Sequence, residues 1–133
     1  MGTRGYRSFE NDDALDWVGE LVEAEDTGPI SEALDAVLEA DYVEAPEASI
    51  GLAAAEVVAA MMGNPAEDLP DEVQSWIVGK EPPEPALVEK AQTAVERILE
   101  DSELKELWED PEDEESAKWR EEVEGLLRRL GSA

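Results

Sequence analysis

Carboxylates recur at helical spacing near the start of the chain. Asp12, Asp13, Asp16, Glu20 and Glu23 share one face of a predicted helix. Their oxygens suit Ca²⁺ or Mg²⁺, or a basic protein surface. A calcium loop, however, places a glycine at its sixth position, and a single helix face supplies too few converging ligands. We therefore assign no metal site and interpret the five acids as a candidate partner-binding face. A solvated helix face is the alternative.

Glu56 is the second candidate, because it is the one acid in a long apolar stretch. A buried carboxylate has to be neutral or paired. Arg4 and Arg7, near the start of the chain, are the candidate partners for a buried ion pair with Glu56. In the alternative interpretation, Glu56 lies on a narrow exposed stripe with Ala60 or Gly63.

The residue types that are absent exclude several chemistries. The 133 residues include no cysteine and no histidine, which excludes disulfides, the usual zinc sites and Ser-His-Asp triads. The nine glycines do not follow the spacing of a phosphate-binding loop. We therefore predict no catalytic and no cofactor-binding residues, and expect no cofactor. A carboxylate-based, metal-dependent enzyme is the alternative left open.

The net charge of −26 arises from 36 acidic and 10 basic side chains. Such a charge disfavours binding to nucleic acid or to an anionic membrane and favours a basic protein as the partner. The leading interpretation is thus a non-enzymatic protein-binding module. A second interpretation is an inhibitor or immunity-type protein that imitates nucleic acid and masks a basic enzyme surface. Adaptation to high salt produces the same composition, so total charge alone does not separate these readings.

The charges are unevenly distributed along the chain. Residues 8–79 carry nineteen acids and no base, whereas eight bases accompany seventeen acids from residue 80 onward. This asymmetry predicts attraction between the two parts, with Lys90, Arg97 or Arg128 facing the acidic part.

Apolar residues recur at helical spacing between prolines and glycines that mark helix boundaries. The predicted fold is all-α: a single compact domain (1–133) of five to six amphipathic helices around an alanine-rich central helix. Residues 1–10 form an N-terminal arm, and the Pro-rich residues 80–86 link to the C-terminal helices. The four tryptophans lie on apolar helix faces and are expected in the core. The predicted helices cover residues 12–25, 29–42, 46–62, 70–78, 87–99 with a continuation or kink near 102, and 111–130.

The start of the chain lacks the apolar run of a signal peptide, and the longest near-apolar window, residues 48–63, is shorter than the ~20 residues that cross a bilayer. We therefore expect a cytoplasmic location.

Two stretches resemble a bacterial family that is catalogued as domain of unknown function 4259. The opening "MGTRGYRSFENDDALDW" is similar to the start of that family, and "VLEADYVEAPEASIGLAAAEVVAAMMGNPAEDLPDEVQSWI" is similar to its middle. The likeness covers about residues 1–100. Arg4 departs from the aromatic residue expected after the first glycine. The resemblance implies a small soluble helical protein and brings with it no activity, cofactor or catalytic residue.

Overall fold

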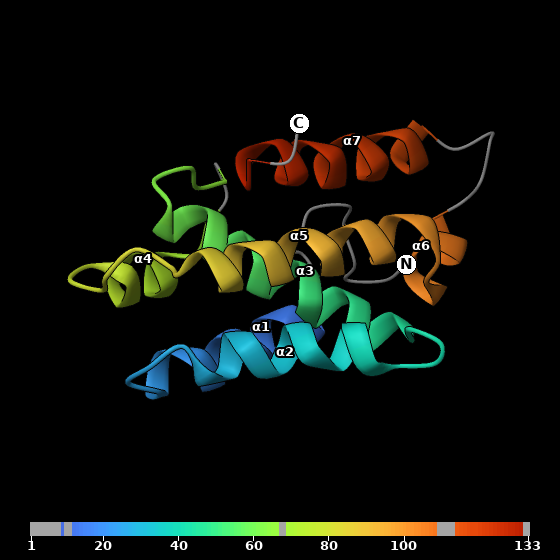
Figure 1. Ribbon diagram of the computed structural model, residues 1–133. Helices are drawn as coiled ribbons and strands as arrows, with labels where there is room; N and C mark the ends of the chain where they lie inside the picture. Colours follow the sequence, from blue (N-terminus) through green and yellow to red (C-terminus); the bar gives the residue numbers. More distant parts are fainter. Residues whose placement is uncertain (1–8, 10–11, 67–68, 109–113, 132–133) are drawn as a thin grey trace.

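The computed structural model describes residue 9 and residues 12–66, 69–108 and 114–131 (Figure 1). Every regular element in this part of the chain is an α-helix, which confirms the predicted all-α class. The other residues of the predicted arm, 1–8 and 10, lie outside the described part. The helices are α1 (Asp12–Glu23), α2 (Gly28–Glu39), α3 (Ala45–Met61), α4 (Asp71–Ile77), α5 (Pro85–Glu100), α6 (Glu103–Trp108) and α7 (Glu114–Arg129).

The described residues contain seven helices, against the five to six predicted, because the helical path beyond α5 is broken at Ser102. The Ser102 hydroxyl accepts a hydrogen bond from the Lys105 N–H (3.0 Å) and donates one to the Ile98 carbonyl (2.7 Å). It therefore occupies the N-cap position of α6, where it satisfies an N–H group that has no partner within the helix. Of the two predicted possibilities, a kink near this residue agrees with the structure better than an uninterrupted helix does.

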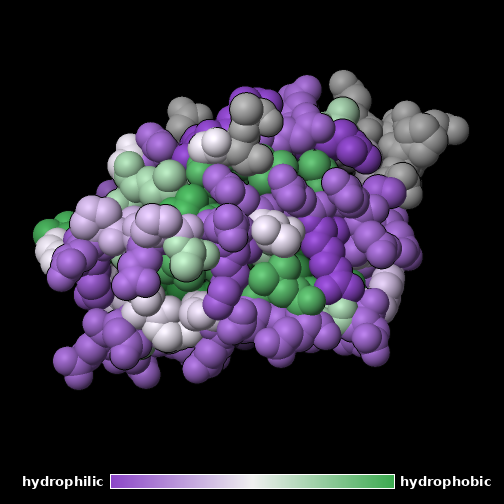
Figure 2. Space-filling view, in the orientation of Figure 1, coloured by the Kyte–Doolittle hydropathy of each residue, from purple (hydrophilic) through white to green (hydrophobic). Residues whose placement is uncertain are grey.

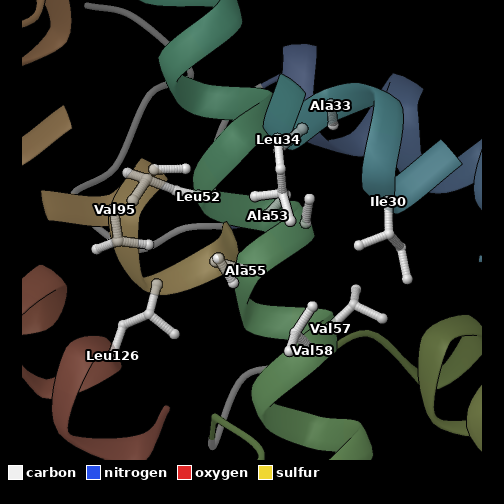
Figure 3. Packing of buried hydrophobic residues seen from close by; sticks show 14 of the residues in the cluster. Ile30, Ala33, Leu34, Leu52, Ala53, Ala55, Val57, Val58, Val95 and Leu126 are labelled. Atoms are coloured by element: carbon white, nitrogen blue, oxygen red, sulfur yellow. The ribbon is translucent and has the colours of Figure 1, made fainter. Parts of the chain in front are cut away.

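Helix α3 forms the centre of the fold, as its composition predicts. Its 17 residues include 13 that are buried, and it contacts each of the other described helices. Figure 3 shows side chains from three neighbours directed at its alanines and valines: Ile30 and Leu34 from α2, Val95 from α5 and Leu126 from α7. Burial of apolar surface on all sides explains why this helix has no polar face.

The ends of α3 are held by local and distant groups. Pro46 fits the first turn, where its missing N–H costs nothing. The N–H of Ala45 donates to Oε1 of Glu103, at the start of α6, over 2.8 Å. Gly63 ends the helix with φ of +93°, a conformation that glycine adopts without strain. The glycine and proline positions thus predict this helix to within about one residue at each end.

Gly51 lets α2, α3 and α5 approach one another closely. A β-carbon built on Gly51 would lie 2.6 Å from Cγ2 of Val37 and 3.2 Å from Cδ1 of Ile98. The first distance is shorter than any ordinary contact, so the packing of these three helices depends on the absence of a side chain here.

Most of the tryptophans lie in the core, as predicted. Trp17, Trp76 and Trp119 are buried, and Trp108 is half-buried and packs against the core. The indole N–H of Trp76 donates to the Ala24 carbonyl (2.8 Å), which ties α4 to the end of α1. These rings therefore fill the interior and do not form an exposed ligand platform.

The Pro-rich connection is shorter than predicted. Pro85 and Ala86 belong to α5, so of the predicted linker residues 80–86 only 80–84 are non-helical. Proline suits the first turn of a helix as well as it suits a linker. Three prolines in four positions therefore do not indicate where the linker ends and α5 begins. Helix α5 packs against both α2 and α3.

Two of the three cations predicted to face the acidic half of the chain contact α2. Lys90 forms an ion pair with Asp35 (2.9 Å) and donates to the Ser31 hydroxyl (3.0 Å). Arg128, the third of the alternatives, is exposed on α7. The guanidinium of Arg97 meets backbone oxygens at the negative end of the α2 dipole, and it forms no ion pair with a described carboxylate. It donates to the carbonyls of Val37, Leu38, Ala40 and Asp41.

Hydrophilic residues cover most of the molecular face in Figure 2, and hydrophobic areas appear as small patches between the helices.

Candidate functional site

The predicted acidic face lies on the outer side of α1. Asp12, Asp16, Glu20 and Glu23 are exposed, and Asp13 is partly buried. The opposite side of the helix packs into the core through Ala14, Trp17, Val18 and Leu21. Because that side is anchored, the carboxylates occupy a fixed helical surface about 18 Å long, at 1.5 Å per residue.

The acidic face carries no compensating cation from the described residues. None of its five carboxylates takes part in an ion pair there. Leu15 is 47% exposed and lies between the acids in sequence, and a side chain at Gly19 would meet nothing within 4 Å. Across the described ranges, no group of three acidic side chains is arranged to hold a metal ion. The face is thus an open, negatively charged surface that includes one apolar side chain.

Glu56 is buried, with 1% of the residue exposed. The alternative of an exposed stripe with Ala60 or Gly63 is therefore wrong for Glu56. The partner that the described residues provide is Arg129 in α7, whose guanidinium donates to Oε1 (2.8 Å) and Oε2 (3.2 Å). This forked arrangement stabilises the charge on a carboxylate that is removed from water. The predicted pairing with Arg4 or Arg7 concerns residues outside the described part and stays a prediction.

Arg129 also joins the ends of two helices. Its Nη1 donates to the carbonyl of Asn64 (3.3 Å), and the side-chain amide of Asn64 donates to the Arg129 carbonyl (3.0 Å). Gln92 of α5 donates to the next carbonyl, that of Leu130 (2.7 Å). Carbonyls at the end of α7, which lack partners within the helix, are thereby satisfied by α5 and by the turn after α3. Glu56 is thus part of the attachment of α7 to the core.

The sequence analysis missed Arg129 and named its neighbour Arg128. A helical projection contains the signal that separates them. Leu126 and Leu130 point into the core, and Arg129 lies about 60° from Leu126, whereas Arg128 lies about 160° away on the outer side. Asking which base flanks an apolar stripe would have identified Arg129.

A third candidate is a groove of about 470 Å³ that the sequence did not predict. Its walls are the α1–α2 loop, α2, the end of α3, residues 80–84 and the start of α5. The α1–α2 loop and the start of α5 lie at the same end of the molecule (Figure 1, left). Its volume falls within the range of ~300–1,000 Å³ typical of small-molecule sites.

A family model described as Domain of unknown function (DUF4259) matches residues 2–122. The chain belongs to this family. The match extends beyond the two stretches whose resemblance the sequence analysis noted, and reaches into α7. No curated protein and no solved structure matches the chain.

The DUF4259 match covers α1, Glu56 and the whole groove, but ends before Arg129. Arg129, which pairs with Glu56, thus lies outside the matched residues. In the described part of this DUF4259 protein, none of the helices combines the length and apolar character needed to span a membrane.

Proposed function

We propose that this DUF4259 protein is a non-enzymatic binding module whose α1 face attaches to a basic protein. The observation that carries the proposal is the set of carboxylates on α1 that have no ion-pair partner among the described residues. A rigid surface of one charge sign attracts a partner of the opposite sign during diffusion and orients it on arrival.

Helix α1 carries five acids and no base, whereas α2 and α4, which also lack bases, carry fewer acids. Helix α5 also carries acids, but it includes Lys90 and Arg97, which meet groups of α2. Helix α1 has no base in its sequence. A basic partner on this face therefore gains the attraction of several carboxylates without displacing an ion pair that stabilises the fold. The exposed Leu15 offers a small apolar contact at the same place.

The experiment compares two variants with the same change in net charge. One neutralises the α1 face, and the control neutralises four exposed acids elsewhere; circular dichroism verifies the folding of both. The α1 variant carries Asp12→Asn, Asp16→Asn, Glu20→Gln and Glu23→Gln. The control carries Glu89→Gln, Glu96→Gln, Glu100→Gln and Glu121→Gln.

Proteins captured from the native cell extract by the wild type should also be captured by the control and lost by the α1 variant. Titration calorimetry with the purified partner then gives the loss in affinity, which we expect to be at least tenfold for four rim charges. Equal losses for both four-charge variants would show attraction by total charge alone and would contradict the proposal. If the partner acts on nucleic acid, its activity with and without the module distinguishes simple binding from inhibition.

A further inference from the structure

The groove beside α5 presents both charge signs and an apolar wall. It is lined by two lysines, three acids, two hydroxyl side chains and five apolar residues. Lys80 and Lys90 supply the positive charges, although the whole chain contains only 10 bases against 36 acids. None of the five carboxylates of the α1 face lines the groove, so the two sites are separate.

Lys80 is available to a ligand. Its ammonium lies 4.4 Å from the centre of the Trp76 ring, and it forms no ion pair with any residue that the structure describes. An ammonium that directs one N–H at an aromatic face keeps its other donors for a further partner. Lys90 is held by Asp35 and Ser31, which uses two of the three donors of its ammonium. The groove therefore contains one ammonium without an ion-pair partner among the described residues, and a second one whose position is fixed.

The negative groups line the same groove. Asp26 accepts a hydrogen bond from the Gly28 N–H through Oδ1 (3.0 Å), which holds its carboxylate at the edge of the α1–α2 loop. Glu81 and Glu84 line the groove from the segment that precedes α5. Apolar groups, among them Leu87, line the groove together with the charged ones. A ligand with one positive end, one negative end and an apolar body matches this arrangement of groups.

The charge of the protein favours a ligand with no net charge. An anion would be repelled by the surrounding field of a chain with net charge −26, and a simple cation would bind at many exposed carboxylates without needing this groove. A zwitterion is subject to neither effect, yet it gains from local groups of both signs. We propose that the groove binds a zwitterionic ligand of amino-acid or dipeptide size with an apolar side chain. Its carboxylate would meet Lys80, and its ammonium would meet the acidic rim.

Titration calorimetry with L-leucyl-L-leucine tests the proposal. N-acetyl-leucine, which keeps only the carboxylate, and leucinamide, which keeps only the ammonium, are the matched ligands. We expect saturable binding of the dipeptide at one site and weaker binding of both single-charge ligands. Lys80→Gln should weaken the dipeptide about tenfold, the effect of losing one charge-assisted hydrogen bond, and should leave leucinamide unchanged. Arg128→Gln removes one positive charge elsewhere and should change neither.

Glu84→Gln provides the complementary variant and should weaken leucinamide and the dipeptide but not N-acetyl-leucine. Absence of saturable heat with all three ligands would overturn the proposal. The proposal would also be overturned if leucinamide bound as tightly as the dipeptide and Lys80→Gln had no effect. General attraction to an acidic surface would then explain the binding. Thermal unfolding of each variant establishes that the fold is intact.

Discussion

Removal of Arg129 is expected to destabilise the fold strongly, although the residue lies near the end of the chain. Arg129→Gln deletes the two hydrogen bonds that Arg129 donates to Glu56, whose carboxylate is 1% exposed. Breaking a buried ion pair by removing one partner costs ~3–5 kcal/mol. The Arg129 side chain is 25% exposed, so water can reach part of the vacated position. We therefore expect the lower end, about 3 kcal/mol of unfolding free energy.

A double-mutant cycle isolates the pair from the other contacts of Arg129. Glu56→Gln retains an oxygen acceptor and should cost about 2 kcal/mol. Because either single change already removes the ion pair, the double variant should lose at least ~1.5 kcal/mol less than the sum of the single losses. Arg128→Gln, one residue away and exposed, is the matched control and should change stability by less than about 0.5 kcal/mol.

Urea titration followed by circular dichroism suits this measurement, because urea is uncharged and does not screen the pair. Salt is held at about 0.15 M throughout. Equal stability of the Arg129→Gln and Arg128→Gln variants, or additive effects of Arg129→Gln and Glu56→Gln, would refute the reasoning. The same cycle with Arg4→Gln or Arg7→Gln tests the prediction that one of these arginines also pairs with Glu56.

Three further predictions concern packing, charge and a phenol. Gly51→Ala should lower the unfolding free energy by about 1–2 kcal/mol, because its β-carbon would lie 2.6 Å from a methyl group of Val37, whose branched side chain is restricted in a helix. Gly19→Ala, which meets nothing within 4 Å, should instead raise the unfolding free energy by about 0.5–1 kcal/mol, and urea titration checks both. The melting temperature should rise clearly from 10 mM to 1 M salt, because salt screens the repulsion between the acids. A net charge of −26 spread over 7175 Å² places neighbouring net charges about 17 Å apart, which lies between the Debye lengths of ~30 Å at 10 mM and ~3 Å at 1 M. A melting temperature that stays the same across this range in calorimetry would contradict the prediction. The pKa of Tyr42 is raised above 10.0 by partial desolvation, then by its hydrogen bond to the Glu106 carboxylate and by nearby acids. The stability linked to this phenol is therefore present below pH 10 and is lost as the pH rises through the folded-state pKa. Ultraviolet titration should show that Glu106→Gln lowers the pKa of Tyr42, and an unchanged value would contradict this assignment.

Local rules predicted the helices well. Proline at helix starts and glycine at helix ends act within a few residues, so α3 and its neighbours follow from the sequence. The break at Ser102 was predicted only as an alternative, because a serine within a helical pattern can either continue the helix or cap the next one. The start of α5 was misplaced for a similar reason, since Pro85 fits a linker and a first turn equally well.

The candidate sites also differ in whether their residues lie on one helix or on several. The acidic face of α1 follows from helical spacing alone, since every residue involved lies on one element. The partner of Glu56 and the groove join residues from separate helices. Arg129 lies 73 positions from Glu56, and the groove brings Asp26 together with Lys80 and Lys90.

The sequence by itself therefore determined that the chain is helical, that α3 is central, and that one face of α1 is acidic, because spacing along one helix decides each of these. Only the tertiary structure decided that Arg129 meets the buried carboxylate and that Lys90 forms an ion pair with Asp35. Those outcomes depend on how helices pack against one another, and helix packing is set by side-chain shape across the whole core.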